Sequence, residues 1–155
     1  MEIRYESSKK EVSKMNTDSL RDQFLFENLF KPNKINLGYS HYDRLIVGGV
    51  IPLSTPLPLP VLAELKSEYL LERREMGIIN VGGNGVVSAD GKPYTLGPLS
   101  CLYLGKGTKE VTFASDDAGN PAVYYLLSST AHKTYLNQIM LKEDAREADI
   151  RMLQK

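Results

Sequence analysis

The sequence has one cysteine, two histidines and no excess of charge of either sign, and these absences exclude several classes of protein. The single cysteine, Cys101, excludes an internal disulfide and a cysteine-based zinc cluster and indicates a reducing compartment. Lys plus Arg number 19 and Asp plus Glu number 19, so a basic surface for nucleic acid is not expected. No apolar run is long enough to span a bilayer, and residues 1–10 hold no signal-peptide core. The sequence predicts a cytoplasmic protein, with no nucleic-acid or membrane partner.

Short runs of strand-forming residues dominate what is there. F-L-F-E-N-L-F, I-N-L-G-Y-S and R-L-I-V-G-G-V-I come first, broken by Lys-Pro-Asn and Gly. From Gly77 onward six more runs follow in close succession: G-I-I-N-V, G-V-V-S-A, P-Y-T-L, C-L-Y-L, E-V-T-F-A and A-V-Y-Y-L-L. Turns every six to twelve residues leave no room for crossover helices. We therefore expect an all-β fold, an antiparallel sandwich or barrel.

Helices are expected only near the two ends of the chain. Residues 1–17 are polar and charged and are interpreted as an N-terminal arm. Thr17 is predicted to cap a short helix that begins at Asp18. Helix-like spacing returns in the tail, residues 137–155, where one stripe contains Leu141, Ala145, Ala148 and Met152.

Two stretches allow more than one interpretation. Residues 51–60 carry four prolines and suit either a polyproline ligand or an extended sheet edge with leucines facing the core; we favour the edge. L-E-R-R-E-M-G-I-I-N-V-G-G-N-G, residues 71–85, suits either a phosphate loop or a turn. A phosphate loop leads into a helix, whereas V-V-S-A-D-G-K follows here and alternates like a strand. We therefore predict a tight hairpin with positive φ at the glycines.

The same stretch carries part of a cupin pattern. Glu75, six residues and Gly82 match the end of the first cupin motif, and Gly97 through Gly105 match the start of the second. The chain thus resembles a cupin barrel, also described as a jelly roll or double-stranded β-helix. The positions of the cupin histidines fall within residues 68–71 and at Thr108, so the resemblance implies a barrel without its metal site.

Three longer segments resemble a more specific family. They are Y-S-H-Y-D-R-L-I-V-G-G-V-I-P, L-E-R-R-E-M-G-I-I-N-V-G-G-N-G and L-Y-L-G-K-G-T-K-E-V-T-F-A-S. They are similar to the N-terminal half of the 4-deoxy-L-threo-5-hexosulose-uronate ketol-isomerases, and the similarity covers residues 18–136. The resemblance implies a degenerate cupin barrel and a role in pectin and uronate breakdown, interconverting a 5-keto and a 2-keto sugar acid. It also implies zinc in the family and a homo-oligomer.

This sequence departs from the family in length. The resemblance implies that the zinc ligands lie in a second barrel, which we expect this chain to lack, whether as an isolated domain, a truncated gene product or half of a split enzyme. No ligand then carries over, no metal is expected here, and residues 137–155 would begin the linker to that barrel. The run L-I-V-G-G-V-I has no polar alternation, which in a sheet means that both faces are covered. We therefore expect residues 44–50 to face a second copy or a second cupin domain.

Candidate functional residues are few. Arg73, Arg74 and Glu75 are candidates for binding the carboxylate of a small anionic sugar acid, because arginine matches carboxylate geometry; the alternative is a charged barrel mouth or subunit interface. His41 and His132 are the only histidines, 91 positions apart, and a structural role is favoured for both.

Two functions of different class remain. In the first, the chain is part of a ketol-isomerase whose proton transfer occurs in a domain not present here, so that the isolated chain is inactive. In the second, it is a non-catalytic cupin that mediates oligomerisation or binds a sugar acid.

Overall fold

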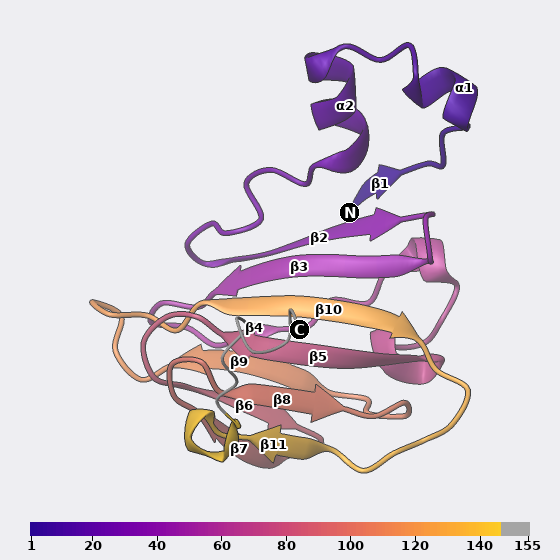
Figure 1. The fold of residues 1–155 in the computed structure, drawn as a ribbon. Coiled ribbons are helices and arrows are strands. Elements are labelled where there is room, and N and C mark those ends of the chain that lie inside the picture. The colour runs from indigo at the N-terminus through magenta and orange to yellow at the C-terminus, as the bar shows by residue number, and fades with distance from the viewer. Residues whose placement is uncertain (147–155) are drawn as a thin grey trace.

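A computed structural model describes residues 1–146 as two packed β-sheets (Figure 1). The larger sheet runs in the order β1 (Glu2–Arg4), β2 (Lys34–Ser40), β3 (Leu45–Ile51), β10 (Tyr124–Thr130), β5 (Arg74–Asn80), β8 (Cys101–Leu104) and β11 (Gln138–Met140). The smaller sheet runs β4 (Leu57–Pro58), β9 (Val111–Ser115), β6 (Gly85–Ala89) and β7 (Lys92–Leu96). All neighbouring strands except β1 and β2 are antiparallel. The expected all-β class, built from mostly antiparallel strands, is confirmed.

The core lies between the two sheets and is apolar. Alternate residues of each strand face inward, and Tyr124, Phe113 and Met76 are among the largest side chains that are fully buried. The Phe113 and Tyr124 rings lie 5.4 Å apart, and the Tyr124 hydroxyl donates to the Ala114 carbonyl oxygen at 2.8 Å. Burial raises the pKa of Tyr124 above its ordinary value, so this phenol stays protonated. The interior is therefore filled by packed side chains.

Helices are short and lie at the N-terminal end. They are α1 (Lys9–Val12) and α2 (Thr17–Phe24), with 3₁₀ turns at Ala63–Leu65, Leu70–Glu72 and Lys142–Asp144. The predicted helix near residue 18 is confirmed, but its cap is Asn16, whose side chain accepts from the Ser19 amide at 2.9 Å. No helix of residues 1–146 is long and apolar enough to cross a membrane.

The expected strand over residues 24–30 is wrong. That segment leaves α2 in an irregular path, and Asn28 and Asn33 take positive φ values of 58° and 55°, which interrupt an extended run. In the C-terminal tail, Ala145 is extended after a single 3₁₀ turn, so no α-helix forms from Leu141 to Ala145. Ala148 and Met152 lie outside the described residues.

Both edges of the larger sheet draw on segments outside residues 18–136. β1 lies within the expected N-terminal arm and pairs with β2, and Nη2 of Arg4 donates to the Leu25 carbonyl oxygen at 3.1 Å. β11 lies within the expected tail and pairs with β8. The proline-rich stretch forms the extended edge that we favoured, since β4 pairs with β9 and Leu57 and Leu59 pack against the core.

The predicted hairpin at Gly82–Gly85 is wrong. β5 belongs to the larger sheet and β6 to the smaller, so the glycines connect the two layers. Neither Gly82 nor Gly83 has positive φ. A Cβ on Gly83 would instead overlap the Asn120 carbonyl oxygen, so glycine is needed there for close backbone approach. The two-residue hairpin is Asp90-Gly91, with φ of 48° and 79°, between β6 and β7.

We expect Gly83→Ala to lower the free energy of unfolding by about 2–3 kcal/mol, because the backbone around Asn120 must move to admit the methyl group. Gly77→Ala is the matched control in β5: the nearest atom to its added Cβ is 3.9 Å away and its φ is not positive, so a change within about 0.5 kcal/mol is expected. Urea denaturation of both variants measures the difference. Equal stabilities would contradict the close-approach explanation.

Candidate functional site

The three residues expected to contact a sugar acid are consecutive, yet they lie in different surroundings. Arg73 precedes β5, its side chain is 71% exposed, and its Nη2 lies 3.6 Å from the Glu72 carboxylate. Arg74 is 5% exposed and shares the inward face of β5 with Met76. Glu75 is half-buried on the opposite face. Because successive strand residues point to opposite faces, Arg74 and Glu75 cannot contact the same small ligand.

The Arg74 guanidinium is held by neutral oxygen atoms. Nε donates to Ser128 Oγ at 3.1 Å, and Nη2 donates to the carbonyl oxygens of Ser128 at 2.8 Å and Arg44 at 2.6 Å. The Tyr39 ring centroid lies 5.9 Å from Cζ. The ion pairs found within residues 1–146 involve Arg4, Arg21 and Arg73, so none of them neutralises Arg74. Burial lowers the pKa of Arg74 from its ordinary value, although a guanidinium stays charged at neutral pH.

A cavity of about 150 Å³ lies beside Arg74. Its lining consists of Leu65, Ser67, Leu70, Arg73, Arg74 and Thr130. The Ser67 hydroxyl is buried and makes no hydrogen bond to any described residue. A buried polar atom without a partner is unusual in a folded protein, so this hydroxyl and the unneutralised guanidinium together mark the cavity as a candidate binding site.

Glu75 belongs to a separate polar group on the outer face of the larger sheet. The Tyr103 hydroxyl donates to Glu75 Oε2 at 2.7 Å, and Ser129 Oγ donates to Oε1 at 3.4 Å. Burial, and next the hydrogen bond to Glu75, raise the pKa of Tyr103 to about 12. The carboxylate that matches the cupin motif therefore faces away from the barrel interior.

The other cupin-motif positions do not fit a zinc ion either. Thr108 is buried, and its hydroxyl donates to the Gly105 carbonyl oxygen at 2.9 Å. Leu70 and Leu71 are buried and apolar. Within residues 1–146, no three side chains of His, Cys, Asp or Glu come close enough to hold a metal. The residues present in this barrel do not match the donor set that zinc requires.

The two histidines lie in unrelated places. His41 stacks on Tyr5 at 4.7 Å between ring centroids and meets the edge of Tyr39 at 5.0 Å. His132 is exposed in the segment that follows β10. His41 is therefore part of an aromatic cluster.

The structure reveals an important residue that the sequence did not single out. Asn80 is fully buried at the inward end of β5, and its side chain makes four hydrogen bonds to backbone groups. Its position offered a signal, since alternation from Met76 and Ile78 places an amide in the core.

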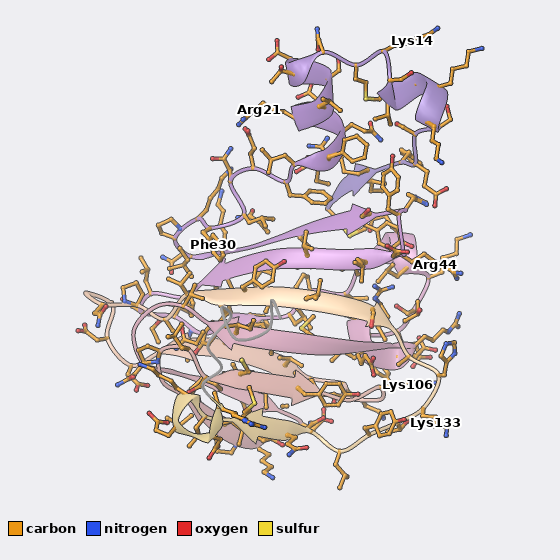
Figure 2. All side chains as sticks on the ribbon, viewed as in Figure 1. Lys14, Arg21, Phe30, Arg44, Lys106 and Lys133 are labelled. Atoms are coloured by element: carbon orange, nitrogen blue, oxygen red, sulfur yellow. The ribbon has the colours of Figure 1, made fainter. Side chains whose placement is uncertain are left out.

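The outer face of β3, expected to meet a partner, is covered in part by this chain itself. Phe26 packs against Gly38 of β2, while Leu29 and Phe30 pack against Gly49 of β3. Phe30 is labelled at the start of β2 in Figure 2. In β3 these contacts lie at Gly49, whereas Leu45 and Val47 on the same face stay half-buried, so the contact of residues 44–50 with a partner remains a prediction.

An apolar patch remains open further across the same sheet face. We call it the outer patch: Ile79, Cys101, Tyr103, Tyr125, Leu127 and Met140. Ile79 is 38% exposed, Leu127 42% and Met140 48%. Large exposed apolar areas are uncommon on monomeric proteins and mark interaction surfaces.

Known proteins that resemble this chain share one name. A protein from Formosa agariphila is 50% identical over 99% of this chain and 55% of its own length, and one from Halalkalibacterium halodurans is 46% identical over 94% and 52%. Both are named 4-deoxy-L-threo-5-hexosulose-uronate ketol-isomerase, as is a 44% identical relative from Lachnoclostridium phytofermentans. The chain spans about half the length of these relatives.

Neither family models nor solved structures add to this result. No family model matches the chain. A cupin protein from Bacteroides fragilis covers 59% of the chain at 15% identity with a TM-score of 0.41. An RmlC-like cupin from Desulfovibrio desulfuricans covers 62% at 14% identity with a TM-score of 0.44. These likenesses are too slight to carry an argument.

Proposed function

We propose that this chain, which is homologous to about half of each 4-deoxy-L-threo-5-hexosulose-uronate ketol-isomerase reported above, forms the N-terminal barrel of such an enzyme. The supporting observation is identity of 43–50% over 87–99% of the chain to curated relatives of that name. The proposed reaction interconverts a 5-keto and a 2-keto sugar acid in the cytoplasm, during pectin and uronate breakdown.

The proposed role of this barrel is not the chemical step. A ketol isomerisation needs a base that moves a proton between adjacent carbons and a group that stabilises the enediolate. Here the interior is packed with apolar side chains, and the residues at the motif positions do not fit zinc. We assign proton transfer and zinc binding to the half of the relatives that this chain does not cover.

The coding sequence beside this chain provides the first test. We expect it to encode a second barrel with a His-x-His-x4-Glu motif, and we expect co-expression of the two parts to yield isomerase activity. An adjacent sequence with no such barrel would contradict the assignment, as would an assembled pair that has no activity.

A second candidate function is a non-catalytic module for assembly or sugar-acid binding. The filled interior and the open outer patch favour it. A substitution in the outer patch can be tested in the co-expressed pair. If activity is lost while both parts stay folded, the chain acts both as half of the isomerase and as its assembly module. If the second barrel alone has full activity, the result favours a non-catalytic role for this chain.

We propose that the purified chain associates with a second copy of itself through the outer patch. In a purified preparation, a second copy is the partner that can cover those apolar side chains. Leu127→Lys, at the centre of the patch, is expected to convert the oligomer to a monomer, since it places a charge in a buried interface. Val61→Lys is the control, because Val61 is 61% exposed and lies outside the patch. Light scattering that gives a monomer for the unaltered chain at micromolar concentration would contradict this proposal.

A further inference from the structure

We propose that the cavity beside Arg74 binds a single carboxylate group. This inference deepens the function proposed above by naming the part of the sugar acid that the first barrel holds, and it rests on that function only for the identity of the sugar. It is separate from the chemical step, which the proposed function assigns elsewhere.

The buried guanidinium of Arg74 has no counter-charge from the described residues. Arg74 is 5% exposed, and the groups that contact its guanidinium are neutral oxygens and an aromatic ring. Arg73 lines the same cavity but lies beside the Glu72 carboxylate. The site therefore has one unneutralised positive charge. A buried charge without a counter-charge is costly, and a bound monoanion relieves that cost.

Two hydrogen-bond donors at the cavity have no acceptor among the described residues. Nε and Nη2 of Arg74 donate to Ser128 and Arg44, whereas Nη1 makes no hydrogen bond to a described residue. The Ser67 hydroxyl lines the same cavity and also lacks a partner. A carboxylate has two acceptor oxygens, one for the guanidinium and one for the hydroxyl.

The volume of the cavity also suits a carboxylate. A volume of about 150 Å³ equals that of roughly five water molecules at about 30 Å³ each. This space admits a carboxylate, while the sugar ring remains outside near Thr130, which lines the cavity and is exposed. A phosphate dianion would bring a second negative charge that Arg74 alone does not balance. The charge of the site favours a carboxylate over a phosphate.

Calorimetric titration of the purified chain with acetate, galacturonate and inorganic phosphate tests the inference directly. We expect acetate and galacturonate to bind saturably, one per chain, and phosphate to bind more weakly than either. The absence of saturable carboxylate binding would overturn the proposal, as would tighter binding of phosphate than of both carboxylates.

Two variants show whether binding occurs in the cavity. Ser67→Ala removes a hydroxyl that has no partner, so we expect unchanged or higher stability and an affinity for acetate that is at least about threefold weaker. Arg74→Lys keeps the charge but loses the planar fork, and we expect a loss of about tenfold or more. Lys92→Gln, on β7, is the control for a lost surface charge and should bind acetate normally. Unchanged affinity in a folded Ser67→Ala variant would overturn the assignment of the site.

Binding and activity can fail separately. Acetate binding by the isolated chain requires no second barrel, so it stands if the isomerase assignment fails. A co-expressed pair that is active although the chain binds no carboxylate would refute the site and leave the proposed function intact.

Discussion

Replacing Asn80 with alanine is expected to lower the free energy of unfolding by about 3–5 kcal/mol, a large part of the stability of a domain of this size. The Asn80 side chain is fully buried. Its Nδ2 donates to the carbonyl oxygens of Gly83 at 2.7 Å and Leu96 at 2.9 Å, and its Oδ1 accepts from the amides of Gly82 at 3.1 Å and Val123 at 3.2 Å. Alanine leaves all four backbone groups without these partners.

The position of Asn80 explains why the loss should be large. It lies in β5 of the larger sheet, whereas Leu96 belongs to β7 of the smaller sheet and Val123 precedes β10. One amide therefore joins the two layers and fixes the glycine connector between them. Without it, buried backbone groups must reorganise or admit water, and each unpaired group costs about 1–3 kcal/mol before such relief.

Urea denaturation measures the free energy of unfolding of the Asn80→Ala variant, and two further variants serve as comparisons. Asn84→Ala lies in the same connector, where Asn84 is exposed, and should change the free energy of unfolding by less than about 0.5 kcal/mol. Asn80→Asp keeps the shape but turns an acceptor toward the Gly83 and Leu96 carbonyls, so it should be destabilising at neutral pH. A loss below about 1 kcal/mol for Asn80→Ala would contradict the proposed role.

Much of the strand content was predictable because local pattern determines it. From residue 34 onward, runs of strand formers separated by Gly, Pro, Asn and Asp correspond to strands in the structure. Assignment of strands to sheets was not local. The glycines after β5 suited a hairpin equally well, and only the packing of β5 against β10 and β8 shows that β6 joins the other layer. The segment at residues 24–30 is apolar because it covers the sheet rather than because it belongs to it.

The candidate site was predictable only in part. The sequence selected Arg73, Arg74 and Glu75 together, but strand alternation separates Arg74 from Glu75. The cavity also requires Thr130, which β10 places opposite Arg74 of β5, and Ser67, which lies between the two 3₁₀ turns that precede β5. Ser67 carries no sequence signal, because its importance comes from a hydroxyl left without a partner by the final packing.

The isolated chain is not expected to isomerise a 5-keto-4-deoxyuronate. The whole chain contains two histidines and one cysteine, and no three potential metal ligands come together in residues 1–146. The enediolate formed during isomerisation must be stabilised, and general base catalysis alone supplies roughly 10²–10⁴-fold. Enzymes typically reach about 10⁶-fold or more.

Glu75 does not provide an alternative catalytic base for a ligand bound at Arg74. Its carboxylate accepts hydrogen bonds from Tyr103 and Ser129 on the outer face of the sheet. Arg74 faces the interior from the neighbouring position in the same strand. A sugar acid held by its carboxylate beside Arg74 is therefore separated from Glu75 by the sheet itself, and binding without turnover is the expected outcome.

An isomerase assay of the purified 155-residue chain shows whether this barrel carries out the chemical step. The chain is incubated with a 5-keto-4-deoxyuronate, with and without added zinc, and product is followed over time, while circular dichroism confirms that the chain is folded. We expect no product above the uncatalysed rate under either condition. Turnover of about one per second or faster, within the usual enzyme range, would show that this barrel is itself the catalytic one.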